Sequence, residues 1–326
     1  MKSYFSRRRF LGSSATVAAA AIGGRAFAQR APVHLLVGYP AGGATDVVAR
    51  LVARNMAGFD TVLVENRAGA GGRIAVEAVS SAKGDGQTVV VTPDFPLTVF
   101  PHLYSKLRYD PLKDLLPVAM CGTSELAFSV GPAVPKEVST VSEFMDWARR
   151  NPKLAMYASP SPGSTPHFTG VMLAGAAKTD LTHVAYKGGA QAIQDLLGGQ
   201  VPVSINPVAE VLPHLASGRL RVQGTSGQAR SRFLPDVPTF REAGYPGVVV
   251  QSWIGIFAPA NTPEATLAVL EKSIGEALKT QAVVEGFAKL GMSVASVPRH
   301  RLAAIVREDL HRWASVVAAS GFKVNE

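Results

Sequence analysis

The stretch VHLLVGYPAGGATD, residues 33–46, decides how this chain is expected to fold. Residues 33–38 form a short apolar run ending in glycine, which predicts a buried strand, and residues 42–56 carry apolar side chains at helical spacing. The loop between them holds Gly42 and Gly43, which can adopt backbone conformations closed to other residues. A strand, a glycine loop and a helix in this order are typical of a parallel sheet flanked by helices.

The same alternation continues along the chain. Further strands are expected at 61–64, 88–92, 154–158, 183–186, 201–205, 220–224 and 251–258, and further helices at 73–82, 142–150, 166–177, 190–197, 212–216, 263–280 and 299–319. We interpret two segments, 118–130 and 224–232, as passages between domains. The sequence therefore predicts an α/β protein with a discontinuous first domain (residues 29–128 and 227–326) and a second domain (residues 129–226).

Composition excludes several classes of protein. The 326 residues are 47% hydrophobic, which rules out wholesale disorder, and after residue 30 no apolar run is long enough to predict a membrane-spanning helix. The single cysteine, Cys121, excludes an intrachain disulfide, and the histidines show no metal-binding spacing, so we expect no metal or cofactor. Residues 1–28 carry five basic residues and no acid, which leaves a net charge of only +4 on the remainder, too little to indicate nucleic-acid binding.

The first 28 residues resemble an export signal. Paired arginines, Arg7 and Arg8, precede a short run of small apolar residues and an Ala-Phe-Ala end at residues 26–28. The arginine pair is similar to that of twin-arginine signals, which carry folded proteins across the inner membrane. We expect cleavage near Ala28-Gln29 and a periplasmic mature chain, and the alternative is an N-terminal membrane anchor.

Three junctions between a strand and a helix favour anion binding. In the first, residues 38–46, free amides at a helix N-terminus face a possible ligand, and Asp46 can accept hydrogen bonds from amides of its own loop. The alternative is an ordinary turn with a capping acid. The second, residues 159–167, brings three hydroxyls to one helix end, and could equally be a hydroxyl-rich cap. There His167 is either a ligand contact or a partly buried helix residue.

The third junction, residues 184–190, has a Gly-Gly pair preceded by Tyr186 and Lys187, which could serve a carboxylate, although Lys187 alone reads as a solvated surface lysine. Ligands of open parallel sheets bind beyond the carboxyl ends of the strands, so the three junctions together indicate one cleft. Trp253 could line it or belong to the core.

Motifs that are typical of other functions are incomplete or absent. Residues 69–74 imitate a dinucleotide-binding fingerprint but place Ile74 where the third glycine belongs, and neither a phosphate-binding P-loop nor a G-x-S-x-G nucleophile motif occurs. No nucleophile–base pair is recognisable, so the sequence does not predict an enzyme.

Spaced motifs along the whole mature chain resemble the solute receptors of tripartite tricarboxylate transporters, also called Bug receptors. The motifs are Pro40-x-Gly42-Gly43-x-x-Asp46-x-x-Ala49-Arg50, Val64-Glu65-Asn66-Arg67-x-Gly69-Ala70-x-Gly72, Tyr109-Asp110-Pro111, Gly163-Ser164-x-x-His167, Val184-x-Tyr186-Lys187-Gly188, Asp195-Leu196-x-Gly198-Gly199-Gln200 and Leu234-Pro235-Asp236-Val237-Pro238-Thr239. The resemblance implies a two-domain periplasmic binding protein of the Venus-flytrap type, with a parallel-rich sheet and flanking helices in each domain and no catalysis.

The resemblance implies that the ligand binds at residues 39–46, 161–165 and 186–189, and the residues themselves add Thr92, Asp94 and His167 as candidates. The expected contacts are Tyr39, Pro40, Ala41, Gly42, Gly43, Asp46, Thr92, Asp94, Ser161, Gly163, Ser164, Thr165, His167, Tyr186, Lys187, Gly188 and Gly189. The family is known for small residues where this chain has residues 92–96, with two prolines and Asp94. At the cleft Asp94 would repel a second carboxylate, which leaves open a ligand with one carboxylate and a cationic, amide or aromatic part; alternatively, Asp94 is a turn residue.

We therefore expect a monomeric receptor that binds a small carboxylate-type ligand, such as an organic, amino or aromatic acid, and delivers it to the membrane permease subunits of a tripartite transporter. The alternative is a periplasmic ligand sensor that signals to a membrane histidine kinase.

Replacing Arg7 and Arg8 by lysine should trap the precursor in the cytoplasm, because twin-arginine export depends on the arginine pair. Fractionation followed by immunoblotting measures this. Periplasmic accumulation of protein that starts at Gln29 in this variant would instead indicate a general secretory signal.

Overall fold

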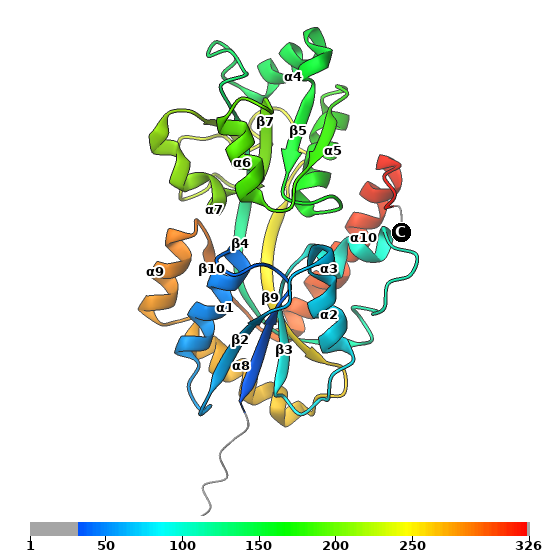
Figure 1. Cartoon of the computed structure of the whole chain (residues 1–326), viewed down its shortest axis with the longest axis vertical. Helices are drawn as coiled ribbons and strands as arrows, with labels where there is room; N and C mark the ends of the chain where they lie inside the picture. Colours follow the sequence, from blue (N-terminus) through cyan, green and yellow to red (C-terminus); the bar gives the residue numbers. More distant parts are fainter. Residues whose placement is uncertain (1–31, 325–326) are drawn as a thin grey trace, which may run out of the picture. The chain divides into compact units, whose positions relative to one another are not determined.

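The computed structural model describes residues 32–324, and the predicted signal peptide at 1–28 lies outside this part of the chain. Residues from Pro32 onward form one compact unit. Its centre is a ten-stranded sheet with strand order β2-β1-β3-β9-β4-β7-β5-β6, to which β8 and β10 attach through β4 (Figure 1).

We call the elements built on the first three strands the first lobe. Strand β1 pairs in parallel with both β2 and β3, as the strand–helix alternation predicts. The elements in chain order are β1 (Val33–Val37), α1 (Ala44–Asn55), β2 (Val62–Asn66), α2 (Arg73–Ser80), β3 (Thr88–Pro93) and the short α3 (Phe95–Thr98).

The elements built on β5, β6 and β7 form the second lobe. Strand β5 pairs in parallel with both of its neighbours, so the carboxyl ends of all three strands lie at one edge of the sheet. The elements are α4 (Val141–Arg150), β5 (Met156–Ser159), α5 (Thr165–Ala176), β6 (Thr182–Ala185), α6 (Gly189–Leu197), β7 (Val203–Pro207), α7 (Val208–Val211), the 3-10 helix η4 (Leu212–Ser217) and β8 (Arg221–Thr225).

Two antiparallel strands join the lobes. The first part of the 16-residue β4 (Leu115–Val130) pairs with β9 (Gln251–Pro259), whereas its last residues pair with β7 and β8. Figure 1 shows β4 and β9 running side by side between the two groups of elements. The first lobe is completed by α8 (Glu264–Ala277), α9 (Gln281–Lys289) and β10 (Ser293–Val297), and α10 (Arg299–Ser320) ends the chain.

Some details differ from the sequence-based expectation. The expected passage at 118–130 is most of β4, a strand continuing through both lobes, and its antiparallel pairing makes the sheet mixed. Polar residues Thr123 and Ser124 interrupt the apolar pattern of this strand, which is buried on both faces and so shows no clear alternation. The sequence reading also missed α9 and β10, and residues 212–216 form a 3-10 helix.

The hydrophobic clusters show which segments pack together. In α10, Leu302 belongs to a cluster of the first lobe, whereas Trp313 packs in the cluster that contains Phe128 of β4 and Phe168 of α5. Phe240 lies in this second cluster as well, so residues near it pack on the second lobe. The domain boundaries stay a prediction, and this packing favours a return crossing at the start of β9 rather than at 224–232.

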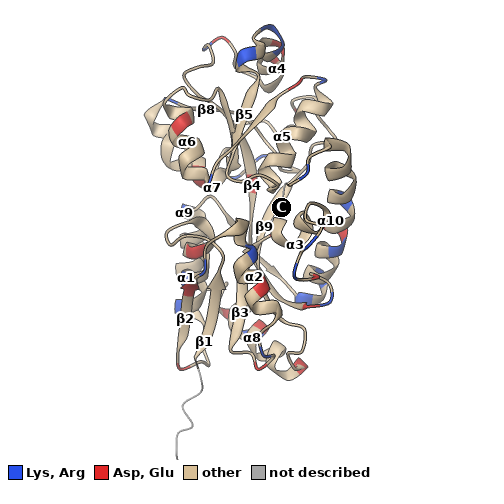
Figure 2. Cartoon of the chain, turned by 45° about the vertical axis from the view of Figure 1, so that its right-hand side comes forward, with Lys and Arg blue, Asp and Glu red and all other residues tan. Residues whose placement is uncertain are grey.

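No helix within residues 32–324 is both long enough and apolar enough to span a membrane. Figure 2 shows acidic and basic residues on the helices of both lobes, and neither sign dominates the face in view.

Two glycines of α5 should respond oppositely to alanine. A Cβ at Gly170 would lie 2.1 Å from the ring of the buried Tyr157, whose hydroxyl is fixed by a bond to the His167 carbonyl. Gly170→Ala should therefore destabilise the protein by about 1–3 kcal/mol through overpacking. Gly175 has open space around it, so Gly175→Ala should stabilise by about 0.5–1 kcal/mol. Urea unfolding of both variants tests the packing of α5; equal effects would contradict it.

Candidate functional site

Most predicted site residues lie in loops that follow the carboxyl ends of parallel strands in both lobes. The others lie at the element ends next to these loops: Thr92 in β3, and Asp46, Thr165, His167 and Gly189 in the first turns of helices. Residues 38–43 follow β1, Asp94 follows β3, residues 160–164 follow β5 and residues 186–188 follow β6. This is the edge of an α/β sheet where ligands bind.

The first loop presents exposed backbone to solvent. Pro40, Ala41, Gly42 and Gly43 are all exposed, and Gly42 has a φ of +84°, a conformation that favours glycine. Gly43 begins α1 with a φ of −70° and offers no side chain to cap the helix. Within residues 32–324 the amides of Ala44 and Thr45 have no hydrogen-bond acceptor, so the N-terminus of α1 is open to an anion.

Asp46 fixes the shape of this loop. It is only 2% exposed, and its carboxylate accepts hydrogen bonds from the Gly42 amide (2.9 Å), Arg50 Nε (3.0 Å) and Asn66 Nδ2 (2.8 Å). Burial opposes ionisation, but the bonds from Arg50, Gly42 and Asn66 outweigh it and lower the pKa of Asp46. The predicted bond to its own loop is thus present, and the carboxylate is used within the protein.

Sequence reasoning gave no role to Arg50 and Asn66, although both stand in the motifs that carry the family resemblance. Asn66 Nδ2 also donates to the Tyr39 carbonyl (3.0 Å), and Arg50 Nη2 donates to Asn66 Oδ1 (3.0 Å). The end of β2 therefore holds the loop after β1. Two of the three guanidinium nitrogens of Arg50, Nε and Nη2, thus already donate hydrogen bonds within the protein.

Tyr39 connects the first loop to its neighbours. Its hydroxyl donates to the Gly71 carbonyl (2.9 Å), and its ring meets Phe95 edge-on with 6.4 Å between centroids. Burial, together with the negative charge of Asp94, raises the pKa of Tyr39 well above its usual value, so the phenol stays protonated.

The second loop is mostly committed to capping α5, as its alternative interpretation held. The Ser164 hydroxyl accepts a bond from the His167 amide (3.4 Å) and donates to the Ser161 carbonyl (2.7 Å), and Ser164 is 1% exposed. In this loop Pro162 is exposed, and Pro160 and Ser161 are half-buried. A Cβ on Gly71 of the first lobe would lie 3.9 Å from Ser161 Oγ, so loops of the two lobes approach each other here.

His167 is buried in the first turn of α5. Its Nδ1 accepts the amide of Gly163 (3.1 Å), and its ring stacks on His183 with 3.8 Å between centroids. Burial and the neighbouring His183 lower the pKa of His167 to about 3, so the ring is neutral at physiological pH. Through its bond to Gly163, the neutral ring holds the second loop from the protein interior.

The third loop joins the second one. Gly188, with a φ of +130°, donates its amide to the Pro160 carbonyl (2.8 Å). The Tyr186 hydroxyl donates to Asp195 Oδ2 (2.7 Å), which together with burial raises the pKa of Tyr186 to about 12. The Lys187 side chain is exposed, and Gly189 is buried.

Asp94 links the lobes. It is 1% exposed and caps α3 through the Phe95 amide (2.8 Å), while its other oxygen accepts the hydroxyl of Thr165 from α5 (3.0 Å). The neighbouring Thr92 is buried too, and its hydroxyl donates to the Pro93 carbonyl (3.1 Å). Burial, with a smaller contribution from the charge of Asp309, raises the pKa of Asp94 to about 7. The Thr165 hydroxyl thus already donates its hydrogen to Asp94.

Sequence reasoning also missed Asn206, near the carboxyl end of β7, and Glu210, in the short α7 that follows. Asn206 Nδ2 donates to Glu210 Oε2 (2.7 Å), and a Cβ on Gly189 would lie only 1.6 Å from the same oxygen. No motif marks these two residues. Their position directly after the strand expected at 201–205 was the one feature of the sequence that could have indicated a place at the ligand edge.

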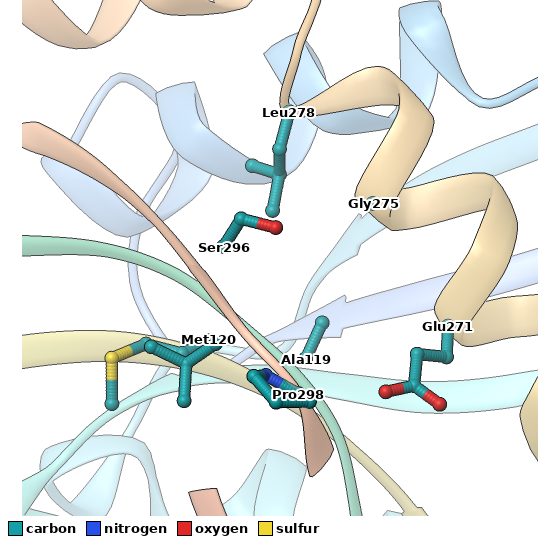
Figure 3. Close-up of a pocket in the computed structure, with 8 residues that line it drawn as sticks. Ala119, Met120, Glu271, Gly275, Leu278, Ser296 and Pro298 are labelled. Carbon is teal, nitrogen blue, oxygen red and sulfur yellow. The ribbon is translucent and has the colours of Figure 1, made fainter. Parts of the chain in front are cut away.

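A separate cavity of about 160 Å³ lies in the first lobe between β4, α8 and β10 (Figure 3). Its lining includes Met120, Glu271 and Ser296, and none of the predicted site residues. Glu271 accepts hydrogen bonds from the amide and the Nε of Arg299, so its charge is already paired.

Two other expectations concern metals and Cys121. Residues 32–324 contain no group of three or more His, Cys, Asp or Glu side chains that could hold a metal ion. Cys121 is buried, and burial raises the pKa of its thiol to about 12, which makes it inert. Trp253 is also buried, and its indole nitrogen donates to Asp309 Oδ2 (2.9 Å).

Asp94→Asn should change how stability depends on pH. Because the folded pKa of about 7 lies above the usual 3.8, the contribution of Asp94 is fully present below about pH 3.8 and is lost as pH rises through 7. Relative to wild type, the variant should therefore gain roughly 2–4 kcal/mol between pH 4 and pH 8. Denaturant unfolding at several pH values measures this. The exposed Asp236→Asn should show no such trend, and a pH-independent difference for Asp94→Asn would contradict the prediction.

Comparison with known proteins gives the same family as the sequence motifs. A family model described as "Tripartite tricarboxylate transporter family receptor" matches residues 48–322. Protein BugT of Bordetella pertussis (strain Tohama I) is 33% identical over 296 residues, which cover 90% of this chain and 90% of BugT.

Solved structures agree. The malate-bound protein MatC of Rhodopseudomonas palustris is 32% identical, with a TM-score of 0.79 over 88% of this chain and 99% of that chain. An adipate-bound protein of R. palustris is 27% identical, with a TM-score of 0.83 over 90% of this chain and 98% of that chain. The chain therefore belongs to the receptor family of the tripartite tricarboxylate transporters, a family of non-enzymatic periplasmic solute-binding proteins with the two-domain Venus-flytrap fold.

Proposed function

We propose that this receptor binds a small ligand through a carboxylate, or an amide of the same shape, on the Gly42-Gly43 loop, and delivers it to the membrane subunits of a tripartite transporter. The observation that carries the proposal is the open N-terminus of α1, where exposed glycines precede amides that lack acceptors within the described chain. Related proteins that carry malate and adipate support a carboxylate ligand.

The ligand is held without a guanidinium fork. Arg50 is bound to Asp46 and Asn66, so the positive potential comes from the helix N-terminus and from backbone amides. From the facing lobe, the accessible Ser161 and the Tyr186–Gly189 loop complete the site. Thr165, Ser164 and His167, which already bond within the protein, position the second loop.

Delivery requires that the lobes open and close around the ligand. We propose that the movement occurs where β4 exchanges its partner β9 for β7, near residues 125–126, and where the chain returns into β9. A receptor that signals to a histidine kinase would bind the same ligand. Deleting the gene of such a receptor would abolish a transcriptional response and leave uptake of the ligand intact.

Gly43→Val should abolish ligand binding while the protein still folds. Gly43 has an ordinary φ, and a Cβ there would meet only the Pro40 carbonyl at 3.4 Å, so the valine projects into the proposed site without a backbone clash. At a ligand concentration of 100 Kd, wild type gains about 2.7 kcal/mol of stability, which the variant should lose.

The measurement is a thermal-shift screen over organic, amino and aromatic acids, malate and adipate included, followed by calorimetric titration of the best binder. Gly247→Val is the matched control, since Gly247 is exposed with open space around it. Wild-type affinity in folded Gly43→Val would place the site elsewhere.

A further inference from the structure

Three helix N-termini meet the predicted ligand edge, and they differ in what already occupies them. The N-terminus of α5 is capped by Ser164, and that of α1 has no side-chain cap. At α6 the capping residue, Gly188, also offers no side chain, but Glu210 of the neighbouring α7 places its carboxylate there.

The contact between Glu210 and α6 is very close. Its Oε2 atom occupies the space of a Cβ on Gly189, the first residue of α6, with the Asn206 amide nitrogen 2.5 Å from the same point. A glycine is therefore required at position 189 for the carboxylate to approach the helix. A helix N-terminus favours an anion, and the Glu210 carboxylate lies beside this one without accepting a hydrogen bond from any described amide of α6.

Glu210 is not neutralised by a basic side chain. Its only hydrogen bond within residues 32–324 comes from Asn206 Nδ2 (2.7 Å), and no Lys, Arg or His in this part of the chain forms an ion pair with it. Asp46 in the first lobe, by contrast, is paired with Arg50 at 3.0 Å. Burial raises the pKa of Glu210, partly offset by the bond from Asn206.

Glu210 keeps partial access to solvent. The residue is half-buried, whereas Asn206, which bonds one of its oxygens, is fully buried. The second carboxylate oxygen, Oε1, accepts no hydrogen bond from any described residue. Glu210 thus offers an acceptor at the carboxyl end of β7, next to the Tyr186–Gly189 loop.

We propose that Glu210 determines ligand specificity: the ligand carries a single carboxylate at α1 and, at its other end, a hydrogen-bond donor, an ammonium or amide group, that binds Glu210 Oε1. This inference rests on the proposed function, because it names the class of ligand for the same site. Of the three helix N-termini, that of α5 is capped by Ser164 and that of α6 lies against the Glu210 carboxylate, so the N-terminus of α1 is the one suited to a ligand carboxylate. A second carboxylate would face the unpaired charge of Glu210, and like charges at close range repel.

The test uses matched compounds of two lengths. Succinate is compared with 4-aminobutanoate and succinamate, and adipate with 6-aminohexanoate and adipamate, so that within each series only the second end group changes. Calorimetric titration of the mature wild-type protein should show tighter binding of the ammonium or amide member in at least one series. A charge-assisted hydrogen bond corresponds to a preference of about 10- to 150-fold over the diacid.

Glu210→Gln keeps the shape and the bond to Asn206 but removes the charge. It should abolish the preference for the ammonium member and increase affinity for the diacid by about tenfold or more. The control is Glu137→Gln, because Glu137 is exposed and lies before α4, away from the loops of the site. Thermal unfolding without ligand verifies that both variants fold.

A wild-type preference for the diacid, an unchanged preference in Glu210→Gln, or no binding by any of the six compounds would each overturn the inference. Diacid binding that is lost in Gly43→Val would overturn it while leaving the receptor function intact. If compounds without a carboxylate bound as tightly as those with one, both this inference and the proposed function would be overturned.

Discussion

The hydrogen bonds of Ser226 tie the segment after β8 to Leu126 of β4 and to Val250, which precedes β9; β4 and β9 are the two strands that join the lobes. Its hydroxyl accepts the Leu126 amide (2.9 Å) and donates to the Val250 carbonyl (2.5 Å), while its backbone bonds the same two residues at 2.9 and 2.8 Å. The residue is fully buried, so no water competes for these bonds. Because β4 changes partners at Leu126, this junction sets how the loops of one lobe face those of the other.

Local patterns predicted the parts of the fold that depend on local sequence. The βα units of both lobes, such as residues 33–56, follow from apolar periodicity and glycine loops, and they form the parallel sections of the sheet. Strand β4 could not be predicted in the same way, because its pairing with β7 and β9 joins residues about 70 to 145 positions apart. The position of Ser226 at the crossing has the same origin, since a lone serine carries no signal of its long-range partners.

At the site too, contacts within one loop could be predicted from the sequence, whereas contacts between distant segments could not. Spacing alone indicated that Asp46 would bond its own loop, and it does so through Gly42. The sequence could not show that the Thr165 hydroxyl would donate to Asp94, which is 71 positions away and in the other lobe. Nor could it show that Glu210 would fill the space left by Gly189, because this contact exists only after β7 has packed beside β5.

Similar sequence signals can therefore have opposite chemical consequences. The Gly42-Gly43 and Gly188-Gly189 pairs both precede a helix and both indicate anion binding when read alone. At α1 the nearby carboxylate, Asp46, is neutralised by Arg50 and turned toward its own loop, so the helix N-terminus stays open. At α6 the nearby carboxylate is unpaired and lies against the first helical residue. Under the proposed function, two junctions that look equivalent in sequence become an anion-binding end and an anion-repelling end, and a cleft built from such a pair would give its ligand a direction.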